Sequence, residues 1–444
     1  MNRGFVRLSG FLRITDYQSL TKPFHPDPIP AGGGEVGFLS GSGSRDCPCC
    51  GDTTAFNLIC TIRLAKPVSY PGDEALRVGT CGVCGMGYSE DGVTQDALDT
   101  YYAESAKYAD LAVYSKPAVV GSLEAEAPWE LERSQSLVRF AESHISKSEF
   151  VLDIGCSTGT ALMILRDDGY QKLGGIDPLA ASVRIAREGR QLDVIGGRFG
   201  TPHPTGRPDV VLVSHVLEHV LDVHQAIEAL ADSLEVGGRV VVEVPDASRF
   251  HEHVYAPFQD FNTEHINHFS LPHLHALMAS HGFEELSLEE ALVRSGPHHI
   301  YPVARGIWQY TGQKIAPGSV VHDGGTLREA LGLYVNTSEE IFRRIDANVQ
   351  RDVSNEPFVI WGAGQFAMKL IRRTGFPLKH CIGIVDSSPS RLGLQIDQFT
   401  VGRPEDLRDS PPSVVLTGSI FGAESIANAV LEMGLNSRVV PLSH

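Results

Sequence analysis

Two pairs of cysteines near the start of the chain have the residue type and the spacing of a metal site. Two residues separate Cys47 from Cys50 and Cys81 from Cys84, and a glycine follows the second cysteine of each pair. Two thiolates from each tight turn complete a tetrahedron around Zn²⁺, and four thiolates leave no coordination position open for a substrate. We therefore expect a structural zinc ion, with reduced thiols that bind no metal as the alternative. Two further cysteines lie nearby and are able to replace one of the four, Cys49 and Cys60.

A glycine-rich turn in the middle of the chain lies between an apolar segment and a helical pattern. Residues 150–154 predict a strand, residues 160–165 predict a helix, and the turn reads Gly155-Cys156-Ser157-Thr158-Gly159. A second apolar segment at 173–176 ends at Asp177. Small residues in such a turn let a ligand approach the backbone, and an acid after the second strand accepts hydrogen bonds from ribose hydroxyls. The pattern predicts a doubly wound α/β fold, and by itself it fits NAD equally well.

Histidines are concentrated in one part of the chain, because half of the 18 lie between residues 251 and 299. Ser270 predicts the N-cap of a helix that ends near residue 282. His273 and His275 are expected on this helix, largely solvated and without a catalytic role.

Glu264 and His265 precede that helix, in the loop after the expected fifth strand. In doubly wound folds this loop faces the ligand crevice. A carboxylate beside an imidazole favours the charged form of the ring, so the pair has the chemistry of a general base. A competing interpretation is a divalent metal site built from two histidine pairs, His251 with His253 and His265 with His268.

The C-terminal part of the chain repeats the strand, turn and helix pattern. An expected strand at 358–361 leads into Gly362-Ala363-Gly364, and a later strand at 381–385 ends at Asp386. Further strands at 413–416 and 438–441, with a helix at 423–433, complete a small Rossmann-like α/β unit. This is a dinucleotide-binding pattern, and a backbone turn with a helix N-terminus is able to receive a diphosphate.

Length and composition limit the classes of protein. The 444 residues correspond to about three domains, and no apolar segment approaches the ~18 residues of a membrane-spanning helix. Lys and Arg number 37 against 54 Asp and Glu, so the net charge of −17 argues against nucleic acid as a partner. We found no targeting segment and expect a cytoplasmic protein. The expected domains are a disordered segment 1–45, a zinc-binding module 46–115, a central domain 116–310, a helical connector 311–355 and a C-terminal domain 356–444.

The central domain resembles class I S-adenosylmethionine (SAM)-dependent methyltransferases over about residues 130–305. The resemblance lies in the segments VLDIGCSTG, GIDP, DVVLVSHVLEHV and LEVGGRVVVEVPD, in this order. It implies that the methionine part of the cofactor is bordered by Asp153, Gly155, Cys156 and Gly159. It further implies that Asp177 holds the ribose and that Arg198 and Phe199 lie near the adenine, and His215 is expected among the cofactor-binding residues.

The whole arrangement is similar to the sugar C-methyltransferase family, which acts on nucleotide-linked keto-deoxysugars. That family combines a zinc module, a methyltransferase core, a Glu-His loop and a second small α/β domain. The resemblance implies that His265 is the general base and Glu264 its orienting residue, and that His219, Asn262 or His268 stabilises the enolate oxygen. Asn262 stands where the family has a tyrosine, Tyr108 loosely matches another family tyrosine, and Gly362 and Gly364 match the turn that helps to hold the nucleotide-sugar.

The leading hypothesis is therefore a SAM-dependent methyltransferase that methylates a carbon of a nucleotide-linked keto-deoxysugar, in antibiotic or surface-polysaccharide biosynthesis. Its expected partners are a nucleotide-sugar or a related small molecule, neither nucleic acid nor membrane, and the chain is expected to be a monomer or a homodimer. The alternatives are an O- or N-methyltransferase of a sugar or small metabolite, an NAD-binding bifunctional protein, and a zinc-stabilised scaffold without activity.

Overall fold

The structure is a computed structural model that describes residues 40–41, 45–67, 69–90, 92–105, 127–296, 299–315, 323–353, 355–420 and 422–442. Tyr108 and most of the segment 1–45 that was expected to be disordered lie outside these ranges. No helix within them combines the length and the apolar character needed to cross a bilayer.

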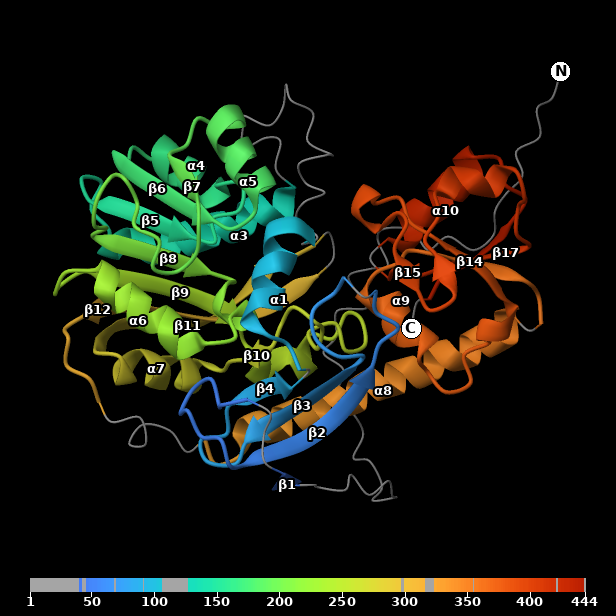
Figure 1. The fold of residues 1–444 in the computed structure, drawn as a ribbon, viewed down its shortest axis with the longest axis horizontal. Coiled ribbons are helices and arrows are strands. Elements are labelled where there is room, and N and C mark those ends of the chain that lie inside the picture. The colour runs from blue at the N-terminus through green and yellow to red at the C-terminus, as the bar shows by residue number, and fades with distance from the viewer. Residues whose placement is uncertain are drawn as a thin grey trace, which may run out of the picture. The chain divides into compact units, whose positions relative to one another are not determined.

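A seven-stranded sheet forms the centre of the chain (Figure 1). Five strands run parallel, with β5 at the middle, in the order β7 (Val194–Gly196), β6 (Lys172–Asp177), β5 (Phe150–Ile154), β8 (Val210–Ser214) and β9 (Arg239–Pro245). Beyond β9 lie two long strands, of which β12 (Ile300–Tyr310) is antiparallel to β9 and β11 (Phe283–Arg294) is antiparallel to β12. The strand order reverses between β5 and β8, and a ligand crevice is expected at the carboxyl ends of strands at such a point. The expected doubly wound core is confirmed.

Helices cover both faces of this sheet, because side chains on its strands alternate between two cores. Val211 and Val213 of β8 pack into the core that includes α6, whereas Val210 and Leu212 pack into the core that includes α3 and α4. The helices are α3 (Pro128–Ala141), α4 (Thr160–Asp167), α5 (Ala180–Arg184), α6 (Val223–Ser233) and α7 (Leu271–Ser280). α5 ends at Arg184, and the chain continues from it as a π-helical turn, Ile185–Gly189.

A second, antiparallel sheet carries the cysteines, and its last strand comes from the histidine-rich part of the chain. Its order is β1 (Ser40–Gly41), β2 (Phe56–Arg63), β3 (Ala75–Cys81), β4 (Gly87–Glu90) and β10 (Asn267–His268). β10 pairs with β4 immediately after the Glu264–His265 loop. After β4 the chain forms α1 (Gln95–Thr100) and a π-helical turn, Tyr101–Ser105. The cysteine module therefore anchors the loop on which the base is expected.

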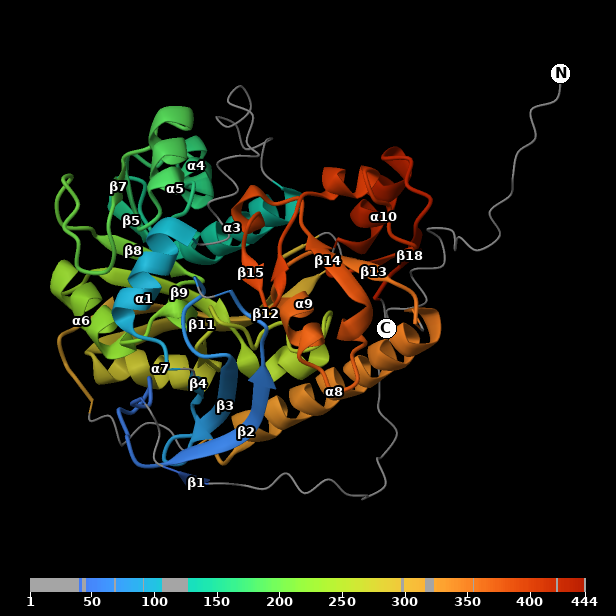
Figure 2. The same ribbon diagram turned by 45° about the vertical axis from the view of Figure 1, so that its right-hand side comes forward.

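The C-terminal part is a four-stranded parallel sheet with a small hairpin. Its order is β14 (Cys381–Val385), β13 (Phe358–Trp361), β17 (Val414–Thr417) and β18 (Arg438–Val440), and the hairpin is β15 (Gln395–Ile396) with β16 (Phe399–Thr400). Its helices are α9 (Gln365–Ile371) and α10 (Ala423–Glu432). The long helix α8 (Thr326–Val353) contacts both β2 of the cysteine module and β18 of this sheet (Figure 2).

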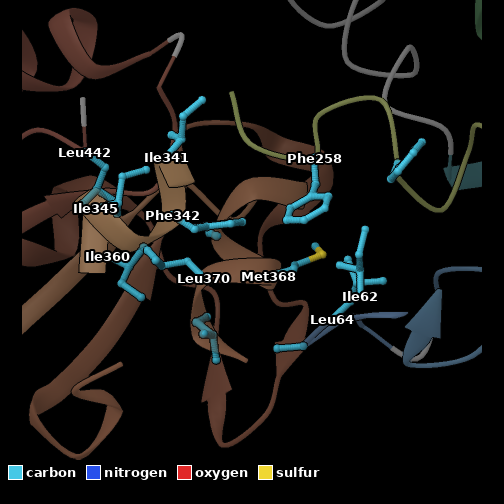
Figure 3. Close-up of a cluster of buried hydrophobic side chains, with 14 of the residues drawn as sticks. Ile62, Leu64, Phe258, Ile341, Phe342, Ile345, Ile360, Met368, Leu370 and Leu442 are labelled. Carbon is cyan, nitrogen blue, oxygen red and sulfur yellow. The ribbon is translucent and has the colours of Figure 1, made fainter. Parts of the chain in front are cut away.

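One apolar core joins these parts (Figure 3). It contains Ile62 of β2, Phe258 of the loop after β9, Phe342 of α8, Ile360 of β13 and Met368 of α9. Each fully buried side chain of this size contributes roughly 1.5–3 kcal/mol relative to its exposed state. The cysteine module, the loop after β9 and the C-terminal sheet therefore stabilise one another.

Candidate functional site

The turn between β5 and α4 needs glycine at two positions for different steric reasons. Gly155 has φ +76°, and a Cβ there would lie 2.4 Å from Cγ2 of Val216. Gly159 has φ +85°, and a Cβ there would lie 2.4 Å from Cδ1 of Leu192. The left-handed conformation is costly for other residues. The two glycines thus hold the backbone of the turn at the carboxyl end of β5.

Two carboxylates lie under this turn. Asp177, at the end of β6, accepts hydrogen bonds from the backbone N of Ser157 at 2.8 Å and of Leu179 at 2.9 Å. Burial raises the pKa of Asp177, although these two hydrogen bonds oppose the shift. Burial, and after it the charge of Asp177, raise the pKa of Asp153 to about 8. A cationic ligand in this position would favour the ionised form of both acids.

A cavity of about 1310 Å³ opens at the carboxyl ends of the parallel strands. Ligand pockets in proteins usually measure about 300–1000 Å³, so this one has room for a cofactor and an acceptor together. Among the residues expected at the site, the cavity is lined by Asp153, Gly155, Cys156, Asp177, Arg198, Phe199, His215 and His219. Gly159 is not among the lining residues, and its role is to allow the left-handed backbone conformation of the turn. Arg198 forms an ion pair with Asp99, which also lines the cavity.

A cluster of imidazoles and carboxylates adjoins this cavity, after β8. His219 lines the cavity, and its ring lies against the ring of His265 with centroids 4.9 Å apart. Ring atoms of His219 and His265 and a carboxylate oxygen of Glu218 all lie within 4.8 Å of one another. Glu218 is 1% exposed. Burial opposes its ionisation, but the neighbouring His219 and His215 outweigh burial and lower the pKa of Glu218.

Two tyrosines of the π-helical turn after α1 connect to the Glu-His loop. The hydroxyl of Tyr101 donates to Oε1 of Glu264 at 2.7 Å, in a buried position. The hydroxyl of Tyr102 lies 3.0 Å from Nδ1 of His219, and Tyr102 also lines the cavity. These tyrosines come six and seven positions before Tyr108, the residue suggested from the sequence. The carboxylate of Glu264 is thus bonded to a tyrosine that sequence reasoning did not identify.

Asn262 and His268 lie behind the loop rather than on the cavity wall. Oδ1 of Asn262 accepts from the backbone N of Glu264 at 2.9 Å and of His265 at 3.0 Å, and so fixes the turn that carries both residues. His268 is 1% exposed, and its Nε2 lies 3.0 Å from Oγ of Ser89 in the cysteine module. Neither residue is among those that line the cavity.

The expectation that His273 is largely solvated is wrong. Ser270 does precede the first turn of α7, but the His273 side chain is fully buried and its Nε2 lies 3.0 Å from the backbone O of Cys84. The helix packs this residue against the second cysteine turn, which the local sequence does not indicate. His275 is only partly buried, with Nδ1 3.4 Å from a carboxylate oxygen of Glu285.

The four expected cysteine ligands lie together. Sγ of Cys47 is 3.6 Å from Sγ of Cys84, and Sγ of Cys50 is 3.7 Å from Sγ of Cys81. Zinc–sulfur bonds of about 2.3 Å place tetrahedral ligands roughly 3.8 Å apart, so these two distances are close to those around a zinc ion, and all four sulfurs lie within 4.8 Å of one another. The backbone N of Val83 also lies 3.3 Å from Sγ of Cys81, as expected for a thiolate ligand.

The two remaining cysteines of this part of the chain lie elsewhere. Sγ of Cys49 points to the backbone O of His273 at 3.6 Å, and Cys60 lies within β2 beside the shared apolar core. Within the described ranges, groups of three or more closely spaced ligands number two: the four cysteines, and Glu218 with His219 and His265. The alternative metal site predicted from His251, His253, His265 and His268 is therefore wrong for this set, because of these four only His265 belongs to such a group.

The C-terminal glycine turn is present, and the acid after β14 is bonded to it. Gly362 has φ +115°, and a Cβ there would lie 3.1 Å from the backbone C of Gly418; Gly364 precedes the seven-residue helix α9. The carboxylate of Asp386 accepts from the backbone N of Ala363 at 2.6 Å. Asp386 also accepts from the guanidinium of Arg391 at 3.1 Å. In these contacts the acid stabilises the turn itself.

Comparisons with known proteins agree with this geometry. Residues 130–288 match the family model described as a methyltransferase domain. The C-methyltransferase NovU of Streptomyces niveus is 26% identical over 160 residues, which are 34% of this chain and 37% of that protein. The match to this relative thus spans little more than a third of its length.

Two solved structures are similar to about two fifths of the chain. A SAM-dependent methyltransferase of Methanosarcina mazei is 16% identical with a TM-score of 0.34, over 39% of this chain and 98% of that one. A SAM-dependent methyltransferase of Thermotoga maritima is 21% identical with a TM-score of 0.33, over 42% of this chain and 93% of that one. Residues 130–288 therefore match a methyltransferase domain, and the parallel strands in this part of the chain have a Rossmann-like order.

Proposed function

We propose that this chain is a SAM-dependent methyltransferase that methylates a carbon atom of a nucleotide-linked keto-deoxysugar. The observation that carries the proposal is the shared cavity, which is lined by the glycine turn and both carboxylates of a cofactor site and also by His219 of the imidazole cluster. NovU, whose name describes a C-methyltransferase, supports the choice of carbon as the acceptor.

The cofactor is expected to lie over the β5–α4 turn. Asp177 would accept hydrogen bonds from the ribose hydroxyls, and Gly155 would let the methionine part approach the backbone. The sulfonium carries a positive charge near Asp153, whose ionised form it stabilises. The protein's task is to hold sulfur, methyl carbon and acceptor in line, since positioning supplies much of the rate of such a transfer.

Carbon methylation requires a carbanion equivalent next to the ketone. A base removes the proton from that carbon, the enolate carbon bonds to the methyl group, and the carbon–sulfur bond breaks with its electron pair on sulfur, leaving S-adenosylhomocysteine. His265 is the base expected from the sequence, and His215 is a second imidazole on the cavity wall. Donors near the enolate oxygen, such as the hydroxyl of Tyr102, lower the energy of the charge that develops there.

The cysteine module is proposed to hold a structural zinc ion through Cys47, Cys50, Cys81 and Cys84. The ion would fix the turn before β2 and the turn after β3, and so support β4 and the loop paired with it. The acidic chain is proposed to bind the nucleotide part of its substrate through local backbone amides and a few arginines rather than through its overall charge.

The test is a transfer of ¹³C-methyl from labelled SAM to a nucleoside-diphosphate keto-deoxysugar, followed by NMR of the product. A new carbon–carbon bond at the position next to the ketone is the expected result. In D₂O without SAM, deuterium should enter at the same carbon. A labelled methyl group on oxygen or nitrogen, or no exchange at carbon, would overturn carbon methylation.

A thermal shift experiment tests the cofactor separately. S-adenosylhomocysteine should raise the melting temperature, whereas NADH should not. A shift with NADH alone would favour the dinucleotide-binding alternative.

A further inference from the structure

The carboxylate of Glu218 is the least satisfied charge near the cavity. Both of its oxygens are buried, and their near neighbours are imidazoles rather than an arginine, a lysine or a well-aligned hydroxyl or amide donor. Nδ1 of His215 lies 3.2 Å from Oε1, and Nε2 of His219 lies 3.8 Å from the same oxygen. A buried carboxylate costs several kcal/mol unless a positive charge or a set of donors compensates it.

A second buried acid beside His215 does not share this condition. Glu243 of β9 is 0% exposed, but its Oε2 lies 3.2 Å from the guanidinium of Arg305 and its Oε1 accepts from the hydroxyl of Ser214 at 3.1 Å. The chain therefore supplies an arginine and a hydroxyl to one buried acid and only imidazoles to the other.

His219 is held in the orientation of a metal ligand. Its Nδ1 lies 2.8 Å from the backbone O of Glu264, so that nitrogen carries the proton and donates it to the carbonyl. The lone pair is then on Nε2, the atom that faces Glu218. Metal-binding histidines characteristically donate their other ring nitrogen to a carbonyl or carboxylate in this way.

We propose that Glu218, His219 and His265 bind a divalent first-row transition metal ion at the edge of the cofactor cavity. Their candidate ligand atoms lie within 4.8 Å of one another. Bonds of about 2.1 Å would place these atoms roughly 3–3.5 Å apart, so binding of an ion would draw them closer together. Two imidazoles and one carboxylate are a ligand set typical of such ions, and three protein ligands leave coordination positions open.

The open positions matter because His219 lines the cavity. A cation there would attract the ketone oxygen of an acceptor and stabilise the enolate, and it would compensate the buried charge of Glu218. A ring nitrogen that binds the ion cannot also accept a proton, so His265 would change from base to ligand. His215, on the same cavity wall, is then the imidazole left to remove the proton.

The experiment is a titration of the full chain, with its zinc-binding module filled with Zn²⁺, using Co²⁺ as the probe. Metal analysis should show one Co²⁺ bound in addition to the zinc. Its visible spectrum should show the weak d–d absorption bands of a Co²⁺ ion with nitrogen and oxygen ligands. Co²⁺ that displaces zinc from thiolates would instead give intense sulfur charge-transfer bands, so the two sites are distinguishable.

The variants Glu218→Gln and His265→Gln should each weaken Co²⁺ binding more than about 100-fold. His253→Gln is the matched control, because this histidine is in the same part of the chain but outside the cluster, and it should bind as the wild type does. Wild-type protein that binds no Co²⁺ beyond the zinc site overturns the proposal, whether or not the variants fold. Equal binding by wild type and both variants also overturns it.

The metal proposal and the proposed reaction fail in different ways. A chain that methylates the sugar after complete removal of the second ion disproves a catalytic role for the ion and leaves carbon methylation intact. A chain that binds Co²⁺ at Glu218 but transfers no methyl group keeps the metal site and loses the proposed reaction.

Discussion

Replacing His268 by glutamine should remove a large acid-dependent loss of stability. His268 is 1% exposed, and its imidazole packs against the ring of Phe261 with centroids 4.8 Å apart. Burial, and after it the charge of Arg45, lower the pKa of His268 from 6.5 to about 3. The unfolded chain therefore binds a proton at this residue between pH 6.5 and 3 that the folded chain does not bind.

The size of the effect follows from this difference in pKa. Stability from this residue is complete above pH 6.5 and is lost as the pH falls toward 3. At pH 5 the solution is 1.5 pH units below the pKa of this imidazole in the unfolded state, whereas the folded state stays unprotonated. Protonation therefore lowers the free energy of the unfolded state, and with it the stability of the protein, by about 2 kcal/mol. At pH 8 the ring is unprotonated in both states, so the loss of stability is close to zero. Glutamine keeps a polar atom for Ser89 but does not titrate.

The assay is urea unfolding of wild type and His268→Gln at pH 8, 7, 6 and 5 with zinc present. The loss of unfolding free energy between pH 8 and 5 should be smaller in the variant by about 2 kcal/mol. Phe342→Leu is the control, since a cavity in the shared core, at a ring that does not pack against this imidazole, lowers stability at every pH without changing the slope. An identical pH slope in wild type and His268→Gln would refute the reasoning and show that the folded protein protonates this ring readily.

Two further predictions concern the cofactor turn and the shared core. Gly155→Ala places a Cβ 2.4 Å from Val216 in a left-handed turn, so calorimetry should show at least a tenfold loss of S-adenosylhomocysteine affinity, and wild-type affinity would contradict this. Lys369 of α9 is 3% exposed and donates to the backbone O of Phe258, and burial lowers its pKa from 10.5 to about 7. Between pH 7 and 10.5 the Lys369 side chain is therefore protonated in the unfolded chain but not in the folded chain. The free energy of unfolding of the wild type should rise by about 2 kcal/mol from pH 7 to 8.5, whereas that of Lys369→Met should lack this rise. Equal pH slopes of urea unfolding for the two proteins would exclude this account of Lys369.

The parts of the site that sequence reasoning identified are those encoded by short-range patterns. The β5–α4 turn and Asp177 lie within about 30 residues of one another, and strand, turn and helix follow from local periodicity and glycine positions. The cysteine pairs are equally local, since each tight turn presents two sulfurs at a fixed spacing.

The parts that were missed depend on contacts between distant segments. His273 is buried because its ring reaches Cys84, a residue 189 positions away. Tyr101 and Tyr102 contact a loop more than 160 positions later, and nothing in their own surroundings distinguishes them from core tyrosines. Glu218 had a local signal, since it directly precedes His219, but its burial without a donor is evident only in three dimensions.

The pairing of β10 with β4 has a consequence for the order in which the chain folds during synthesis. The contact between Ser89 and His268 spans 179 residues. At roughly 5–20 residues per second, the ribosome needs on the order of 10–35 s to deliver β10 after β4 has been made. During that interval β4 is an unpaired edge strand, the kind of edge that pairs with other chains. A nascent chain that binds zinc early would hold this edge in a fixed conformation until its own partner strand arrives.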